Sequence, residues 1–128
     1  MMTRDPVAPL RAERFLREAT RHLSQWEGTY IHDAILRDYH EKTGQVDGGY
    51  GRWLDALIDH LQARYDLHGT RILDFGSGTG ELVVRMNVLG HRATGIDLHV
   101  PHLRLARILA EENGLDPSIF VHNEEPRL

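Results

Sequence analysis

The residues in this chain best suited to ligand chemistry stand where two short apolar runs end. The first run ends in a carboxylate and three glycines at alternate positions, over the segment Arg71-Ile-Leu-Asp-Phe-Gly-Ser-Gly-Thr-Gly80. The second run, Thr94-Gly-Ile-Asp97, also ends in a carboxylate. Glycines allow the backbone to turn sharply with positive φ and to approach a ligand closely. N–H groups at the start of a following helix favour an anionic group.

The elements needed to hold these residues follow from the pattern of residues 69–128. Short apolar runs predict strands over 71–75, 93–97 and 119–122, and longer periodic segments predict helices over 80–89 and 101–113. Gly90 and Gly114 are placed to end these helices in a left-handed conformation, and Pro101 is suited to a helix start. Strands separated by helices predict right-handed crossovers and a parallel α/β sheet, which binds ligands beyond the carboxyl ends of its strands.

Residues 1–68 have a helical pattern and form the first of two predicted units, 1–68 and 69–128. One helix is predicted from Leu10 to Leu23, with Pro9 in its first turn or just before it. A second begins near Ile31 and fails by Gly44, and a third carries an apolar face that includes Trp53. We expect Trp53 to pack in the core.

Composition excludes several classes of protein. The 128 residues allow one ordinary domain, with 41% hydrophobic and 27% charged residues. There is no cysteine, and therefore no disulfide or thiolate site. No run is long enough to cross a bilayer, and the N-terminus lacks the apolar segment of a signal peptide. A net charge of −4 without a basic cluster argues against a nucleic-acid partner. A cytoplasmic location is the default expectation.

The two runs together resemble the cofactor site of class I S-adenosylmethionine-dependent methyltransferases. The resemblance covers residues 71 to about 122, and the helices before them more loosely. A dinucleotide-binding fingerprint is the main rival, but its third glycine would come one residue later than Gly80. Glu81 would also put a carboxylate beside the pyrophosphate. The acid two residues before the first glycine, Asp74, is a further feature of the methyltransferase pattern.

The resemblance implies a Rossmann-like fold, S-adenosyl-L-methionine as cofactor, and roles for individual residues. Asp97 would accept hydrogen bonds from both ribose hydroxyls, and Asp74 would lie under the sulfonium and amino end. Leu98 would flank the adenine, and Asn123 and Glu124 follow the third strand where an adenine contact is usual. The implied cofactor-binding residues are Asp74, Phe75, Gly76, Ser77, Gly78, Thr79, Gly80, Asp97, Leu98 and Asn123.

Other side chains favour simpler interpretations. His99 and His102 stand three apart near a helix start, and without a third ligand we expect a solvated helix end and no metal. His32 and His40 are candidates for a general base, but no catalytic residue can be assigned. Tyr30 and Tyr50 are candidates for an acceptor pocket. The charged residues Arg104, Arg107, Glu111 and Glu112 predict a solvated helix face.

The family's sheet normally has seven strands in the order 3-2-1-4-5-7-6, whereas this chain supplies the first three. The first strand would then lack its inner neighbour, and we expect its open edge to pair with a second copy or a complementing chain. The alternative is that the N-terminal helices cover that edge. The expected function is methyl transfer to a small-molecule acceptor by this chain or by the protein of which it is a fragment. The alternative is a non-catalytic remnant or interaction module that binds cofactor weakly or not at all.

Overall fold

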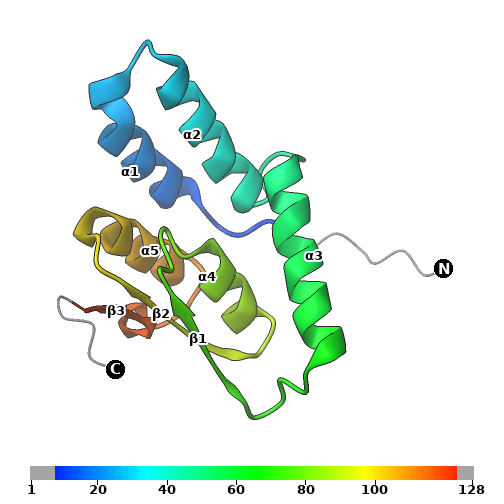
Figure 1. Ribbon diagram of the computed structural model, residues 1–128. Helices are drawn as coiled ribbons and strands as arrows, with labels where there is room; N and C mark the ends of the chain where they lie inside the picture. The colour runs from blue at the N-terminus through cyan, green and yellow to red at the C-terminus, as the bar shows by residue number, and fades with distance from the viewer. Residues whose placement is uncertain (1–7, 124–128) are drawn as a thin grey trace.

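The computed structural model describes residues 8–123. The helical half consists of α1 (Glu13–Leu23), a 3-10 turn η1 (Ser24–Trp26), α2 (Tyr30–Lys42) and α3 (Gly49–Arg64). The second half alternates β1 (Arg71–Phe75), α4 (Glu81–Val88), β2 (Arg92–Asp97), α5 (Val100–Glu112), η2 (Pro117–Ile119) and β3 (Phe120–His122). Figure 1 shows the sheet with α4 and α5 beside it, and α1 and α2 as a hairpin beyond them.

The three strands form one parallel sheet in the order β1-β2-β3. Asp74 pairs in register with Gly95, and Asp97 pairs with His122. Because all three strands point the same way, the residues that follow β1 and β2 meet at one edge of the sheet. The fold is therefore α/β, and it corresponds to an incomplete Rossmann-like fold.

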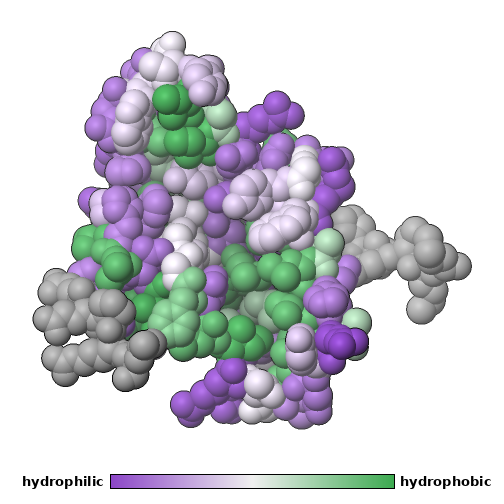
Figure 2. Space-filling model, in the orientation of Figure 1, coloured by the Kyte–Doolittle hydropathy of each residue, from purple (hydrophilic) through white to green (hydrophobic). Residues whose placement is uncertain are grey.

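The helices α4 and α5 cover one face of this sheet. Both crossovers step in the same direction along the sheet, and right-handed connections then place their helices on the same side. On that face Ala93 is 3% exposed and Phe120 is 1% exposed. The alternate positions Leu73, Phe75 and Val121 are exposed on the opposite face. Figure 2 shows apolar residues gathered in the part of the view where Figure 1 places the strands.

The helical segment shares its core with the α/β part. Phe15 and Tyr39 pack edge to face, with ring centroids 5.6 Å apart, within the cluster that also contains Val84. The carboxylate of Glu112, at the end of α5, accepts hydrogen bonds from the backbone N–H groups of Arg14 and Phe15. That carboxylate pairs with N–H groups at the start of α1 that have no partner within the helix. Its negative charge also interacts favourably with the positive end of the α1 dipole.

The predicted order of helices and strands is confirmed, and three details are wrong. Leu10 precedes α1 and is not part of it, although it is buried. Trp53 is 57% exposed, because α3 turns Leu54 and Ile58 towards the core instead. The charged face of α5 is not simply solvated, since Glu112 binds the start of α1 and Arg107 donates to the carbonyl of Phe120.

Gly90 and Gly114 do adopt positive φ, and Pro101 does lie in the first turn of α5. Within residues 8–123, none of the helices combines the length and the apolar character needed to cross a bilayer.

Candidate functional site

The segment 76–80, called here the glycine loop, folds over the carboxyl end of the neighbouring strand. The backbone N–H groups of Gly76 and Ser77 both donate to the carbonyl of Ile96, at 2.8 and 3.1 Å. The φ angles of Gly76, Gly78 and Gly80 are 73°, 57° and 86°. All three fall in the left-handed region that other residues rarely adopt, which explains why this turn needs glycine.

The three glycines have different surroundings. A Cβ atom added at Gly76 or Gly78 would meet no atom within 4 Å, so this part of the loop borders open space. A Cβ at Gly80 would lie 2.5 Å from the ring of Phe120 and 2.8 Å from Ala106. Gly80 therefore allows the start of α4 to pack closely on β3 and α5, whereas Gly76 and Gly78 leave room for a ligand.

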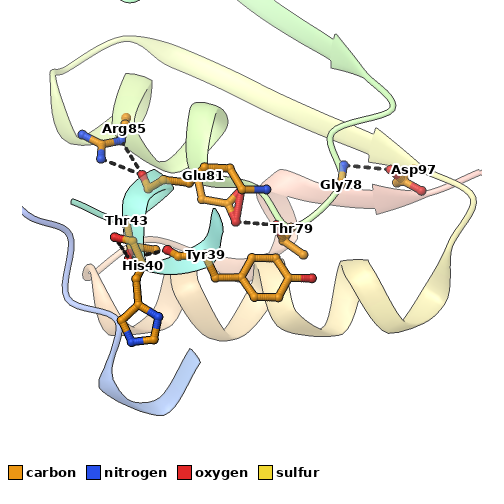
Figure 3. A network of polar contacts seen from close by, with 9 residues as sticks. Tyr39, His40, Thr43, Gly78, Thr79, Glu81, Arg85 and Asp97 are labelled. Carbon is orange, nitrogen blue, oxygen red and sulfur yellow. Dashed lines mark hydrogen bonds and ion pairs between the residues drawn. The ribbon is translucent and has the colours of Figure 1, made fainter. Parts of the chain in front are cut away.

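Asp97 links the end of β2 to the glycine loop. Its Oδ2 accepts a hydrogen bond from the N–H of Gly78 at 2.8 Å (Figure 3), and its Oδ1 accepts one from His99 at 2.8 Å. Partial burial alone would raise the pKa of Asp97, but these two donors, the nearby His102 and the N–H of Leu98 together lower the pKa below its ordinary value. Each carboxylate oxygen still has a lone pair for a further donor.

Asp74 lies at the end of β1 and is partly buried. Its burial raises the pKa above the ordinary value, and the nearby charge of Asp97 raises it further. The two acids are thus close enough for their charges to interact, and Asp97 is the one stabilised by the backbone N–H groups of Gly78 and His99. A cationic group between them would relieve the repulsion.

A hollow of about 240 Å³ lies beside the glycine loop and Asp97. This volume is below the ~300–1,000 Å³ of typical small-molecule sites, so it suits part of a ligand. Phe75 and Leu98 are 68% and 59% exposed at its walls, which gives a planar apolar group two surfaces to pack against. The residues lining it are Phe75, Gly76, Ile96, Asp97, Leu98 and Asn123.

Most of the predicted site residues meet in this region, in different ways. Ser77 tucks its side chain against Gly95, and its buried hydroxyl has no hydrogen-bond partner among the described residues. The hydroxyl of Thr79 is also buried and donates to Glu81. Asn123 lines the hollow, and its N–H donates to the carbonyl of Asp97 at 3.4 Å. Glu124 lies outside the described residues.

Sequence reasoning missed two neighbours of the site. Ile96 lines the hollow because its register with Phe75 places both side chains on the same face of the sheet. That alternation was visible in the sequence. His102 stacks edge to face on His99 with centroids 4.2 Å apart. Burial lowers the pKa of His102, as does the nearby His99, so it is not the solvated residue that we expected.

Glu81 also differs from its expected position. It is 5% exposed and turned towards Thr79 and Lys42, away from solvent. Glu81 still argues against a dinucleotide pyrophosphate at this loop, because its buried negative charge lies at the start of α4 and disfavours a second anion there. This effect does not depend on direct contact with a ligand.

A larger hollow, of about 590 Å³, lies at the opposite end of the strands and contains none of the predicted site residues. It is formed around the segments 65–70 and 89–92, which precede β1 and β2. Ligands of open α/β sheets bind at the carboxyl ends of the strands. The hollow beside the glycine loop is therefore the candidate site despite its smaller volume.

Comparison with known proteins identifies methyltransferases. The chain is 30% identical over 117 residues to a ubiquinone biosynthesis O-methyltransferase of Maricaulis maris, covering 90% of this chain and 42% of that protein. It is 41% identical over 64 residues to the protein of the same name from Xanthomonas oryzae pv. oryzae, covering 50% and 25%. It is 38% identical over 69 residues to a ribosomal protein L11 methyltransferase of Ectopseudomonas mendocina, covering 53% and 21%.

No protein-family model matches the chain, and no solved structure matches it significantly. The chain spans less than half the length of these curated relatives. The names of these relatives nevertheless agree with the function expected for a parallel sheet with this glycine loop. Named methyltransferases at modest identity over partial coverage, together with this fold, support the assignment of the chain to the class I S-adenosylmethionine-dependent methyltransferase family.

Proposed function

We propose that this chain is the cofactor-binding part of an S-adenosylmethionine-dependent methyltransferase that acts on a small molecule. The observation that carries this proposal is the bond between Asp97 and Gly78, which places a carboxylate and a ligand-accessible glycine loop at one hollow. The ubiquinone O-methyltransferases named above support methyl transfer as the reaction.

The residues around the hollow fit this cofactor. The open space over Gly76 and Gly78 admits the methionine end, and the remaining lone pairs of Asp97 suit the ribose hydroxyls. Phe75 and Leu98 offer apolar surfaces to the adenine. Asp74, which is partly buried near the charge of Asp97, suits the cationic amino and sulfonium groups.

When bound, the cofactor would supply a methyl group already activated by a positive sulfur. The residues of this chain would then act mainly by alignment, because a well-oriented pair of reactants needs little further catalysis. Asp97 would fix the position of the sugar, and the glycine loop would fix the direction of the methyl group. We propose that the N-terminal helices contribute to the acceptor side of the site.

The acceptor and partner assignments depend on charge and on the open edge of the sheet. A net charge of −4 favours a small-molecule acceptor over a nucleic acid. Among the described residues, β1 pairs only with β2, which leaves one edge of β1 open. We propose that this edge pairs with a second copy or a complementing chain.

Calorimetric titration with S-adenosylhomocysteine tests the cofactor site. We expect micromolar binding that Asp97→Ala weakens ~100-fold, since hydrogen bonds to a charged group contribute ~1.5–3 kcal/mol each. Asp116→Ala is the matched control, because Asp116 also accepts the N–H two residues ahead, at 2.9 Å from Ser118, but lies before β3. Circular dichroism of both variants checks that they are folded.

The other outcomes of this titration are equally informative. Absence of any binding by the wild-type chain would support a remnant or an interaction module. Binding of NAD in place of S-adenosylhomocysteine would support a nicotinamide-dependent enzyme. An equal loss of affinity in Asp97→Ala and Asp116→Ala would contradict the assignment of Asp97 to the ribose.

A further inference from the structure

Lys42, the last residue of α2, is held by α4 at two points. The guanidinium of Arg85 donates to the carbonyl of Lys42 from Nε at 3.1 Å and from Nη2 at 2.6 Å. The ammonium of Lys42 lies 3.8 Å from Oε2 of Glu81. Glu81 and Arg85 are four residues apart on α4 and therefore share one face of that helix. The end of α2 thus contacts α4 through the side chains of Glu81 and Arg85.

Two aromatic rings confine the ammonium of Lys42. Its Nζ lies 5.1 Å from the ring centroid of Tyr39, on α2, and 4.8 Å from that of Tyr50, on α3. Both distances are within the ~6 Å typical of cation–π contacts. The side chain is 16% exposed. Lys42 is also the only lysine in the chain, so no other residue of this type can substitute for it.

Glu81 connects Lys42 to the glycine loop, because its side chain contacts both Lys42 and Thr79. Its side chain is 6% exposed, and a buried carboxylate is costly unless it is paired and hydrogen-bonded. Its Oε1 accepts the hydroxyl of Thr79, as Figure 3 shows, while its Oε2 faces Lys42. Thr79 stands between Gly78 and Gly80, and the N–H of Gly78 binds Asp97. A continuous set of contacts therefore runs from Lys42 to the cofactor-binding loop.

We propose that Lys42 is a positioning residue for cofactor binding: it neutralises Glu81, which in turn holds Thr79 and the glycine loop in their binding conformation. This inference depends on the proposed function of the loop. It predicts that the helices before the sheet contribute to cofactor affinity through a buried charge pair, without touching the cofactor. It also explains why a carboxylate is tolerated at the first turn of α4 beside a ligand site.

The test is a double-mutant cycle with the variants Lys42→Met, Glu81→Gln and the two combined. We expect Lys42→Met to weaken S-adenosylhomocysteine binding about tenfold, equivalent to about 1.4 kcal/mol, because Glu81 is left buried without a cation. The combined variant removes both charges and keeps an oxygen for Thr79, so its affinity should return to within about threefold of wild type. Lys42→Arg should also bind nearly as wild type. Arg14→Met, which breaks the exposed pair with Glu111, is the control for loss of one positive charge.

One further readout keeps the inference separate from the proposed function. The backbone amide NMR signals of the glycine loop, in protein without ligand, should shift in Lys42→Met and return in the combined variant. If wild type binds no S-adenosylhomocysteine but these signals respond as described, the proposed function fails and the positioning contact stands. Equal losses in Lys42→Met and the combined variant, or unchanged loop signals in both, would overturn the inference. Should Lys42→Met not fold, the combined variant and Lys42→Arg decide the matter alone.

Discussion

At the scale of single residues, the surroundings of Asp97 and Asp74 have opposite effects on the charged forms of these two acids. Asp97 is stabilised in its charged form by the N–H groups of Gly78 and His99. Asp74 is destabilised in its charged form by burial and by Asp97. The first arrangement favours a stable structure, and the second favours binding of a cation at the cost of stability. Such a conflict between stability and ligand binding is common at functional sites.

We predict that Asp74→Asn raises the Tm of the ligand-free chain at pH 7. A carboxyl group whose folded pKa is raised stabilises the protein fully below its unfolded pKa, and this contribution is lost as pH rises through the folded pKa. The gain from the substitution should therefore be small near pH 4 and larger at pH 7. Differential scanning calorimetry across this range measures it.

Asp47→Asn serves as the control, since Asp47 forms an exposed pair with Arg52 and such pairs contribute little. The same Asp74→Asn variant should bind S-adenosylhomocysteine more weakly. A lower Tm at pH 7 than that of wild type would show that the charge of Asp74 is already compensated in the ligand-free fold.

At the scale of elements, the junction between β1 and α4 carries most of the site. The loop glycines divide into two that border open space and one, Gly80, that lets α4 approach β3 and α5. Arg85 further ties α4 to the carbonyl of Lys42 and lies 3.6 Å from Asp55 of α3. The helix that starts at the glycine loop is therefore held by contacts with four neighbouring elements: β3, α5, α2 and α3.

We predict that alanine substitutions in the glycine loop separate stability from binding. Gly80→Ala should lower the free energy of unfolding by about 3 kcal/mol, because a left-handed φ and a clash with Phe120 add together. Gly78→Ala meets no atom and should cost about 1.5 kcal/mol from its φ alone. Urea denaturation measures both values.

The effects of the two variants on ligand affinity should not follow their effects on stability. Gly78→Ala should reduce affinity for S-adenosylhomocysteine by more than its loss of stability suggests, because its new methyl group occupies ligand space. Equal losses of stability in the two variants would mean that the loop shifts to accommodate either side chain, and that the packing role of Gly80 is wrong.

At the scale of the whole molecule, the sheet has one covered face and one exposed face. Leu73 and Val121 are 50% and 43% exposed on the face opposite α4 and α5. The outer edge of β1 is unpaired within residues 8–123. Apolar surface next to open backbone groups favours association with another chain.

We predict that the isolated chain associates in a concentration-dependent manner, and that Leu73→Lys reduces this association. A lysine on an edge strand adds charge where a new strand would pair and would have to be desolvated. Size-exclusion chromatography with light scattering measures the mass. Val46→Lys is the control, because Val46 is similarly exposed but lies between α2 and α3. A thermally stable monomer at every concentration would contradict this expectation.

Local patterns in the sequence were enough to predict the α/β fold and the convergence of the glycine loop with Asp97. Apolar periodicity sets the type of each element, and parallel strands necessarily bring their carboxyl ends to one edge. The glycines at 76, 78 and 80 could be assigned to a tight turn because their φ angles are a local property. These features need no knowledge of distant contacts.

Only the tertiary structure decided which loop glycine packs against the core and which ones border ligand space. Gly80 packs against Phe120, which is distant in the sequence. The tertiary structure likewise showed that Glu112 binds the start of α1 and that Trp53 is exposed. Lys42 and Glu81 lie on different helices, and no periodicity within either helix indicates their pairing. Contacts of this kind depend on how the helices dock, which is set by the summed packing of the whole core and not by any one segment.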